Sequence, residues 1–197
     1  MEITFILILI ASYLIGAIPC GVVLTRLTGA GDVRNSGSGN IGATNVYRTA
    51  GRKLGILTLV GDIIKGVIPT VYAVYFAEMT AEQIAMIACA TFLGHLYPVY
   101  LKFKGGKGVA TALGIYLILS PLSVAVAAII FIGLVWIWRY ISLGSISAAA
   151  AIPLLIYSYE GSIPLLVASL FISLMVIWRH RENIGRLISG TENKFKA

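Results

Sequence analysis

Two glycine-rich segments of the chain carry residue types that could bind a phosphate group. The first glycine segment, residues 32–48, interleaves glycines with short polar side chains and ends on an arginine. Glycine adopts backbone conformations closed to other residues, so several main-chain N–H groups can converge on one point. At the start of a helix such a turn forms a concave anion site, which the helix dipole strengthens. The alternative is a flexible loop with capping residues, although a plain linker rarely interleaves Ile, Ala and Val in this way. The groups expected to bind the anion are Ser36, Ser38, Gly39, Asn40, Gly42, Thr44 and Asn45.

The second glycine segment, residues 105–108, reads Gly-Gly-Lys-Gly and comes directly before an apolar run. It is not a P-loop, because the Gly-x4-Gly-Lys-Ser/Thr spacing is missing and no strand fits before it. Nucleotide binding is therefore disfavoured, and an anion site at a helix N-terminus is predicted. The groups expected to contribute are Gly105, Gly106, Lys107, Gly108 and Thr111.

Further polar candidates lie after the last apolar run and near the ends of two others. The basic tail holds His180 and Asn183 among several arginines. Such a tail usually binds anionic lipid headgroups, but the close placement of His, Asn and Gly equally favours a functional site. Ser145, beside Gly144, is a weaker candidate for substrate contact. His95, near the end of the third apolar run, is expected to be a hydrogen-bonded structural group rather than a catalyst.

Two ionisable residues, Asp62 and Lys65, interrupt the second apolar run. They are three residues apart and therefore share one face of a helix. Ionisable groups at membrane depth are costly and raise the question of function. The preferred interpretation is a mutually neutralising pair that braces the helices, because a single pair cannot form a conduction path. Any role beyond that is left open.

The elements that must position these groups are apolar helices. The chain is 58% hydrophobic and only 12% charged, which is far from the composition of a soluble domain. Backbone groups in lipid must be satisfied internally, and the apolar runs are too long for barrel strands. We therefore expect an all-α integral membrane protein with one membrane-embedded domain over residues 1–197. The seven transmembrane helices are expected at residues 3–24, 54–76, 84–101, 109–120, 122–138, 141–159 and 163–178.

The distribution of positive charge predicts the orientation. All Lys and Arg residues except Lys65 fall on one side of these runs or in the tail. Because Lys and Arg in short loops face the cytoplasm, the N-terminus is expected outside and the C-terminus in the cytoplasm. Pro121 should divide residues 109–140 into two spans, since a single span would place Arg139 outside. The net charge of +7 suits lipid and anionic substrates rather than nucleic acid.

The polar clusters and the apolar layout resemble the bacterial PlsY family of acyl-phosphate:glycerol-3-phosphate acyltransferases. The resemblance covers essentially the whole chain. It implies transfer of a fatty acyl group from acyl phosphate to the sn-1 hydroxyl of glycerol 3-phosphate, which gives lysophosphatidic acid and inorganic phosphate. This is the first acylation of phospholipid synthesis, carried out at the cytoplasmic side of the bacterial inner membrane. The matching segments are residues 37–45 with Arg48, 61–66, 94–111 and 180–192.

The residues independently suit that reaction. Two phosphate dianions about 5 Å apart repel by about 13 kcal/mol at an effective dielectric constant of about 20. Several cations and N–H donors must therefore converge, and N–H groups near either turn could stabilise the oxyanion. We expect Ser38 and the 39–45 backbone to bind the acyl-phosphate headgroup, although the two phosphates could be exchanged between the two glycine segments. The expected catalytic residues, which would hold glycerol 3-phosphate and orient its hydroxyl, are Arg48, Lys107, His180 and Asn183.

The proton acceptor has two candidates. His180 is one, because imidazole titrates near neutral pH. The phosphate oxygen of the acyl phosphate is the other, and we favour it because the donor is already activated. Neither a cofactor nor a metal is expected. The expected partners are acyl phosphate, glycerol 3-phosphate, membrane lipid and an upstream enzyme that makes acyl phosphate.

Two other classes of protein compete with this interpretation. A small-anion transporter would need polar groups distributed through the bilayer, whereas here they cluster at one face. A metal-dependent lipid phosphotransferase would need several close carboxylates, and the cytoplasmic segments offer only the scattered Asp32, Glu182 and Glu192. The chain also lacks a His-x4-Asp pair, which disfavours acyltransferases that use that dyad with soluble donors.

Overall fold

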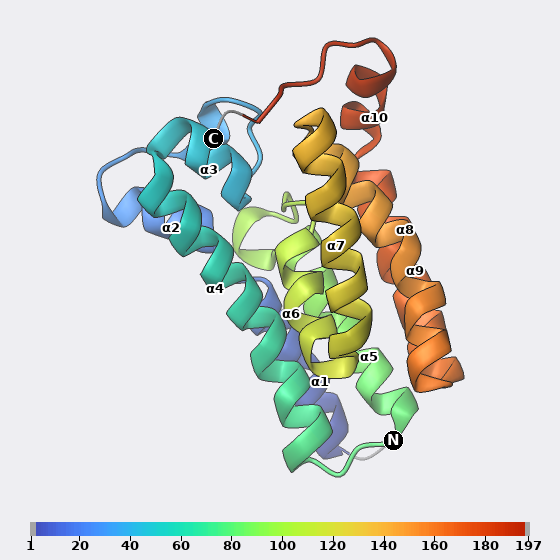
Figure 1. Ribbon diagram of the computed structural model, residues 1–197. Coiled ribbons are helices and arrows are strands. Elements are labelled where there is room, and N and C mark those ends of the chain that lie inside the picture. Colours follow the sequence, from blue (N-terminus) through green and yellow to red (C-terminus); the bar gives the residue numbers. More distant parts are fainter. Residues whose placement is uncertain (1–2, 196–197) are drawn as a thin grey trace. The chain divides into compact units, whose positions relative to one another are not determined.

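The computed structural model describes residues 3–195, and every regular element in that range is helical (Figure 1). The expected all-α class is therefore confirmed for these residues. They form two compact units, residues 3–118 and 119–195. That residues 1–197 form one membrane-embedded domain stays a prediction. Lys196 of the basic tail lies outside the described residues.

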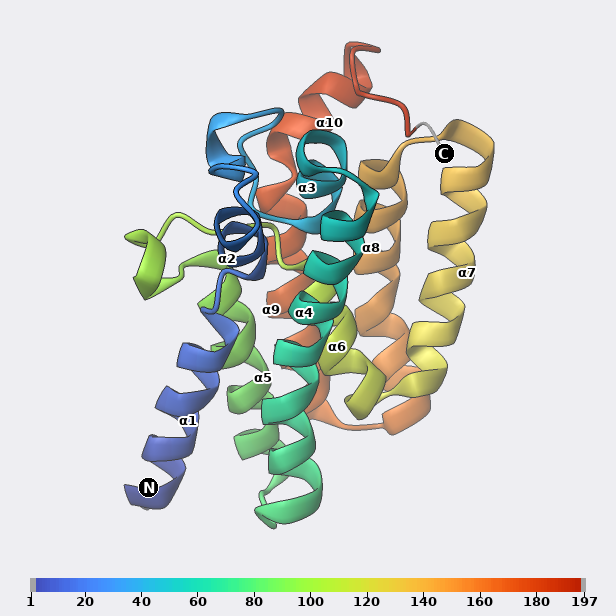
Figure 2. The ribbon, with the colours of Figure 1, turned by 90° about the vertical axis from the view of Figure 1, so that its left-hand side faces the viewer.

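The first unit is built around the helices α1, α4 and α5. Figure 2 shows α1 and α5 side by side along much of their length. Small residues let them approach closely, as is usual in membranes. A Cβ atom at Gly16 would lie 2.0 Å from the carbonyl oxygen of Thr91. The α-helices of this unit are α1 (Ile3–Gly16), α2 (Cys20–Leu27), α3 (Ala43–Ala50), α4 (Arg52–Val71), α5 (Ala81–Leu96) and α6 (Val109–Leu119).

The sixth helix packs equally closely on the fourth. A Cβ atom at Gly66 of α4 would lie 2.3 Å from the carbonyl oxygen of Thr111, and one at Gly114 of α6 would lie 2.1 Å from that of Ile63. Both glycines therefore permit a backbone approach that a larger residue would block. The helix α6 begins directly after the second glycine segment, next to this contact.

The first apolar run is broken, which differs from the single span expected over residues 3–24. The chain leaves the helical path at residues 17–19, and α2 then turns by 48° from α1. Pro19 lacks a backbone donor and precedes the first residue of α2, so it cannot continue the ladder of α1. The break directs α2 toward the first glycine segment.

The second unit is an up-and-down arrangement of α7 (Pro121–Trp138), α8 (Ile141–Glu160) and α9 (Ile163–Arg179), followed by α10 (Arg181–Ile188). In it α8 packs against both α7 and α9 (Figure 1). Arg139 and Gly161 end α7 and α8 in the left-handed conformation, with φ of 63° and 61°. The chain does divide into two helices at Pro121, since this residue begins α7, and that each of them spans the membrane stays a prediction. At His180 the chain bends by 56° into α10.

The described helices include four that are long and apolar enough to cross a membrane, or up to six if each bent pair counts as one span. Large apolar side chains on them face outward, and Trp136 is 84% exposed and Leu154 73%. Such exposure suits contact with lipid. The 11 residues of α6 rise about 17 Å, which is short of the hydrocarbon thickness. A count of seven spans therefore depends on α6 and stays a prediction.

Candidate active site

The first glycine segment starts with a tightly held carboxylate. Asp32 accepts hydrogen bonds from the backbone N and Nε of Arg34, at 3.0 and 2.9 Å, and from Arg26 at 2.8 Å. Hydrogen bonding from the Arg34 side chain, more than any other cause, holds the pKa of Asp32 well below its ordinary value. Asp32 is therefore an ionised brace for the loop and a poor candidate for the proton acceptor.

The centre of this segment is organised by Asn45. Its Nδ2 lies 3.1, 3.1 and 2.8 Å from the carbonyl oxygens of Val33, Ser36 and Asn40, which share its two N–H donors. Its Oδ1 accepts from the backbone N of Ser38 at 2.9 Å. The side chain is buried, with 3% exposure, and ties both ends of the turn to α3. Asn45 therefore shapes the loop, and its expected contact with phosphate stays a prediction.

The other candidate residues of the first glycine segment lie around Asn45. Gly37 and Gly39 need their left-handed conformations, with φ of 61° and 68°, and a Cβ atom at Gly37 would meet Asn45 Oδ1. The Asn40 side chain accepts from the backbone N of Gly42 at 2.9 Å, just before α3. The candidates left at the surface are Ser36, Ser38, Gly39 and Arg48, with Gly42 and Thr44 half-buried.

The second glycine segment forms the expected tight turn before α6. Gly108 has a φ of 83°, and its carbonyl oxygen accepts from Ala112 at 2.8 Å to begin that helix. The backbone N–H groups of Gly105 and Gly106 donate to Leu96 and His95 at the end of α5, at 3.1 and 3.2 Å. These two glycines therefore shape the turn through their amides. Lys107, the third residue of this segment, is half-buried.

Below this turn lies Thr111, which the sequence placed among the groups that contact substrate. It is fully buried, and its hydroxyl lies 3.1 Å from Nδ1 of His95. His95 is itself 2% exposed, as expected for a structural histidine. The two residues connect α5 to the first turn of α6.

In the second unit, Glu192 gathers three donors around one carboxylate. Asn183 and Arg186 of α10 donate to it at 2.7 Å each, and Ser142 of α8 donates at 2.8 Å. Burial by itself would raise the pKa of Glu192, but the hydrogen bonds from Arg186, Asn183 and Ser142 outweigh it and lower that pKa. Sequence reasoning placed Glu192 at the end of the matching segment 180–192 but otherwise treated it as a scattered carboxylate, so it assigned this acceptor no role.

The two tail candidates lie one helical turn apart. His180 is 3% exposed and ends α9, and Asn183 is 7% exposed and lies on α10. The Nδ1 atom of His180 lies 2.8 Å from the carbonyl oxygen of Val176. Because a carbonyl only accepts, the neutral imidazole carries its proton on Nδ1 and presents Nε2 as an acceptor. Ser145, the weaker candidate, is 4% exposed and donates to the Ile141 carbonyl oxygen at 2.9 Å.

Comparison with known proteins identifies the family. The family model described as glycerol-3-phosphate acyltransferase matches residues 6–190. A glycerol-3-phosphate acyltransferase of Syntrophotalea carbinolica is 63% identical over 194 residues, which cover 98% of this chain and 99% of the relative. The chain belongs to the glycerol-3-phosphate acyltransferase family.

Other members of the family agree with this assignment. The relative from Geobacter sulfurreducens is 56% identical over 189 residues, which cover 94% of this chain and 95% of the relative. A crystal structure of PlsY, described as an integral membrane glycerol 3-phosphate acyltransferase in its glycerol 3-phosphate form, superposes with a TM-score of 0.93. It is 40% identical, and the match covers 98% of this chain and 96% of that one. A second structure shows the lysophosphatidic acid form, at 38% identity and a TM-score of 0.91.

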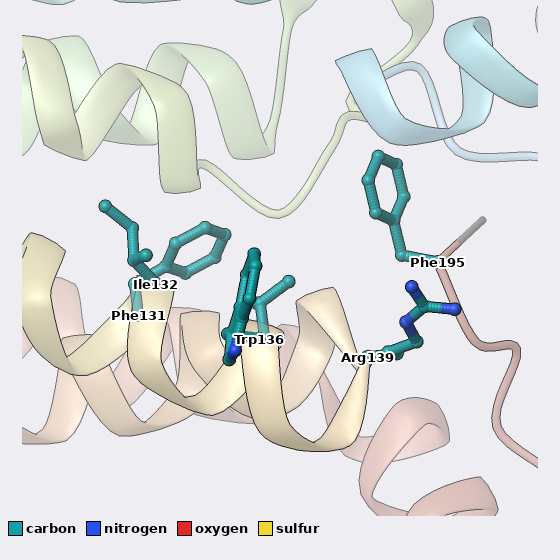
Figure 3. Close-up of a pocket in the computed structure, with 6 residues that line it drawn as sticks. Phe131, Ile132, Trp136, Arg139 and Phe195 are labelled. Carbon is teal, nitrogen blue, oxygen red and sulfur yellow. The ribbon is translucent and has the colours of Figure 1, made fainter. Parts of the chain in front are cut away.

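Each unit of this family member also carries an apolar hollow. In the second unit, a cavity of about 280 Å³ is lined by α7 and the tail, with the Arg139 guanidinium pointing toward the Phe195 ring and Trp136 further along α7 (Figure 3). In the first unit, a hollow of about 330 Å³ lies between α2 and α4, with Leu57 and Ile64 in its wall. Both linings suit an alkyl chain better than a phosphate. Among the described residues, no group of three or more His, Cys, Asp or Glu side chains could hold a metal ion.

Proposed function

We propose that this protein transfers a fatty acyl group from acyl phosphate to the sn-1 hydroxyl of glycerol 3-phosphate. The products are lysophosphatidic acid and inorganic phosphate, and the reaction is the first acylation of phospholipid synthesis. The strongest support is the near-complete match to the PlsY structures, which were described with glycerol 3-phosphate and with lysophosphatidic acid. Acyl phosphate as the donor follows from the family resemblance of the polar segments.

The chemistry requires charge neutralisation more than covalent help from the protein. The hydroxyl oxygen attacks the carbonyl carbon of the acyl phosphate, and the bond from that carbon to the phosphate oxygen breaks. The hydroxyl proton passes to an oxygen of the departing phosphate, so atoms and charge balance without a protein base. Backbone N–H donors near the glycine segments stabilise the oxyanion formed on the way.

The roles of the side chains follow from this scheme. Ser38 and the 39–45 backbone bind the acyl-phosphate headgroup, with Asn40 and Asn45 holding the shape of that turn. Arg48 offers a planar fork to phosphate oxygens, and Lys107 offers a compact charge. Together with His180 and Asn183 they bind glycerol 3-phosphate and orient its hydroxyl. The acyl chain lies along apolar helix faces, open to lipid.

The membrane arrangement is part of the proposal. Seven spans place the polar segments at the cytoplasmic side of the bacterial inner membrane, with α6 starting below the interface. The one-sided distribution of Lys and Arg supports this orientation. Single cysteines introduced at Ser162 and Ser189 of a Cys20→Ser/Cys89→Ser background test it. An impermeant maleimide added to intact cells should label the first site only, and labelling of both or of Ser189→Cys alone contradicts the orientation.

The decisive assay uses purified protein with palmitoyl phosphate and glycerol 3-phosphate in EDTA. We expect equal amounts of lysophosphatidic acid and released phosphate, and no product from palmitoyl-CoA. Arg48→Ala should lower kcat/KM by about a hundredfold or more, since it removes a charge-assisted phosphate contact. Arg52→Ala, an exposed arginine at the start of α4, is the matched control and should stay within about twofold. Glycerol 3-phosphate uptake into proteoliposomes without ester formation would instead indicate a transporter.

A further inference from the structure

Four buried polar side chains from three helices meet inside the first unit. Asp62 and Lys65 come from α4, His95 from α5 and Thr111 from α6, and each is at most 3% exposed. Lys65 Nζ lies 2.8 Å from Asp62 Oδ1, and the same carboxylate oxygen lies 3.7 Å from His95 Nδ1. Thr111 Oγ1 lies 3.1 Å from that ring nitrogen. Charges removed from water are costly, and replacing such a pair by apolar residues is often neutral or stabilising. Stability alone therefore does not explain the Asp62–Lys65 ion pair.

One end of this network contacts the second glycine segment. A Cβ atom at Gly106 would lie 2.2 Å from His95 Nε2, so the imidazole edge lies directly against the glycine backbone. The His95 carbonyl oxygen also accepts from the Gly106 N–H at 3.2 Å. Thr111, in the first turn of α6, contacts the other ring nitrogen of His95, Nδ1. One imidazole therefore contacts both the turn and the first turn of the helix that follows it.

The other end of the network reaches the break between α1 and α2. Lys65 Nζ donates to the carbonyl oxygen of Ile18 at 2.8 Å. Ile18 lies in the non-helical link before Pro19, where the ladder of α1 stops. Lys65 thus contacts both the break before α2 and Asp62. Asp62 in turn contacts both Lys65 and His95.

We propose that Asp62, Lys65 and His95 are positioning residues for acyl transfer. The ion pair fixes the imidazole of His95, the imidazole supports Gly106, and this support places Lys107 for its phosphate. The inference rests on the proposed function, because it assigns the network to the same reaction. A positioning role also explains why the apolar helix α4 carries the charged residues Asp62 and Lys65. The three side chains act on the reaction through the glycine turn, whose residue Gly106 contacts His95 and precedes Lys107.

The test compares variants that remove charge singly and together. Asp62→Asn and Lys65→Met each leave one buried charge unpaired, so both should lower the melting temperature. The double variant Asp62→Asn/Lys65→Met removes both charges, so no buried charge is left unpaired, and it should recover most of the melting temperature. It should nevertheless keep a KM for glycerol 3-phosphate about tenfold above the wild-type value, with kcat within about threefold. His95→Gln, which keeps a polar side chain without the ring, should show the same KM effect.

A second measurement reads the turn without catalysis. Hydrogen exchange of the peptide covering residues 104–108 should be faster in the double variant than in wild type. Ser123→Ala is the matched control, since it removes a buried hydrogen bond of 2.7 Å to Ser120 in the second unit, and it should change neither KM nor this exchange. A double variant with wild-type KM and wild-type exchange overturns the inference. If the wild-type protein showed no acyl-transfer activity, the proposed function would be refuted. Faster hydrogen exchange of residues 104–108 in the double variant would still show that the network supports the turn.

Discussion

The Asn183 side chain donates a hydrogen bond of 2.7 Å to Glu192, and this contact ties α10 to the chain that follows it. The same carboxylate receives Ser142 from the first turn of α8. The amide of Asn183, which is proposed to bind substrate, is thus held by Glu192, nine residues further along the chain. Glu192 therefore helps to hold the orientation of Asn183.

Replacing Glu192 by glutamine should impair both stability and substrate binding. The glutamine amide brings N–H groups toward the donors Asn183 and Arg186, so at least one of these hydrogen bonds is lost. Loss of a hydrogen bond to a charged group amounts to about 1.5–3 kcal/mol of unfolding free energy. The KM for glycerol 3-phosphate should rise about tenfold or more as Asn183 loses its orientation. Glu182→Gln, at an exposed position of α10, is the control. Equal behaviour of the two variants in thermal melts and kinetics would contradict this role.

The stability of the wild-type protein should fall in acid because of the same residue. The folded-state pKa of Glu192 lies below its ordinary value of 4.5. The stability that the ionised group contributes is therefore complete above pH 4.5 and is lost as pH falls through the lower, folded-state pKa. Melting temperatures of wild type and Glu192→Gln should accordingly converge as pH drops from 7 to 3. A constant difference between them across this range would mean that the carboxylate charge is not what stabilises the tail.

Substituting Asn45 by aspartate should collapse the first glycine segment. Aspartate keeps the acceptor for Ser38 but has no donors for the three carbonyl oxygens that Asn45 now serves. Each buried group left unsatisfied costs about 1–3 kcal/mol, and the new negative charge also repels phosphate. We expect at least a hundredfold loss of kcat/KM with palmitoyl phosphate and a lower melting temperature. Asn35→Asp, which adds the same charge at an exposed position of the segment, should be far milder.

A methyl group at Gly106 should displace the second glycine turn. The added Cβ atom would lie 2.2 Å from His95 Nε2, so either the ring or the turn must move. We expect Gly106→Ala to raise the KM for glycerol 3-phosphate about tenfold with a smaller effect on kcat. Gly133→Ala is the matched control, because nothing lies within 4 Å of a Cβ atom there. Steady-state kinetics with both substrates varied would measure this, and a wild-type KM in Gly106→Ala would show that the turn tolerates the shift.

Much of this architecture could be predicted because its signals are local. The apolar runs, the division at Pro121 and the helix start after the second glycine segment follow from composition and from residues that cannot continue a helix. The pairing of Asp62 with Lys65 follows from their spacing on one turn. The break before α2 was missed because Pro19 lies within a run that stays apolar on both sides.

The contacts that organise the candidate site are not local, and spacing alone could not reveal them. Ser142 and Glu192 are 50 residues apart in the chain, and no periodic pattern links them. The amide of Asn45 looks the same in sequence whether it faces a phosphate or the carbonyl oxygens of its own loop. Likewise the contact between His95 and Gly106 depends on the close packing of α5 against the turn, which is a property of the folded chain.

Replacing His180 by glutamine should weaken binding more than it slows turnover. Glutamine retains a polar side chain but cannot act as a general base. If the departing phosphate accepts the proton, the imidazole only holds and orients glycerol 3-phosphate. The variant should then show a KM raised about tenfold with kcat lowered by less than about fivefold, and a solvent isotope effect on kcat like that of wild type. Asn193→Gln, at an exposed position of the tail, serves as the control. A near-total loss of kcat with unchanged affinity for glycerol 3-phosphate, measured by calorimetry, would make His180 the base and end the substrate-assisted scheme.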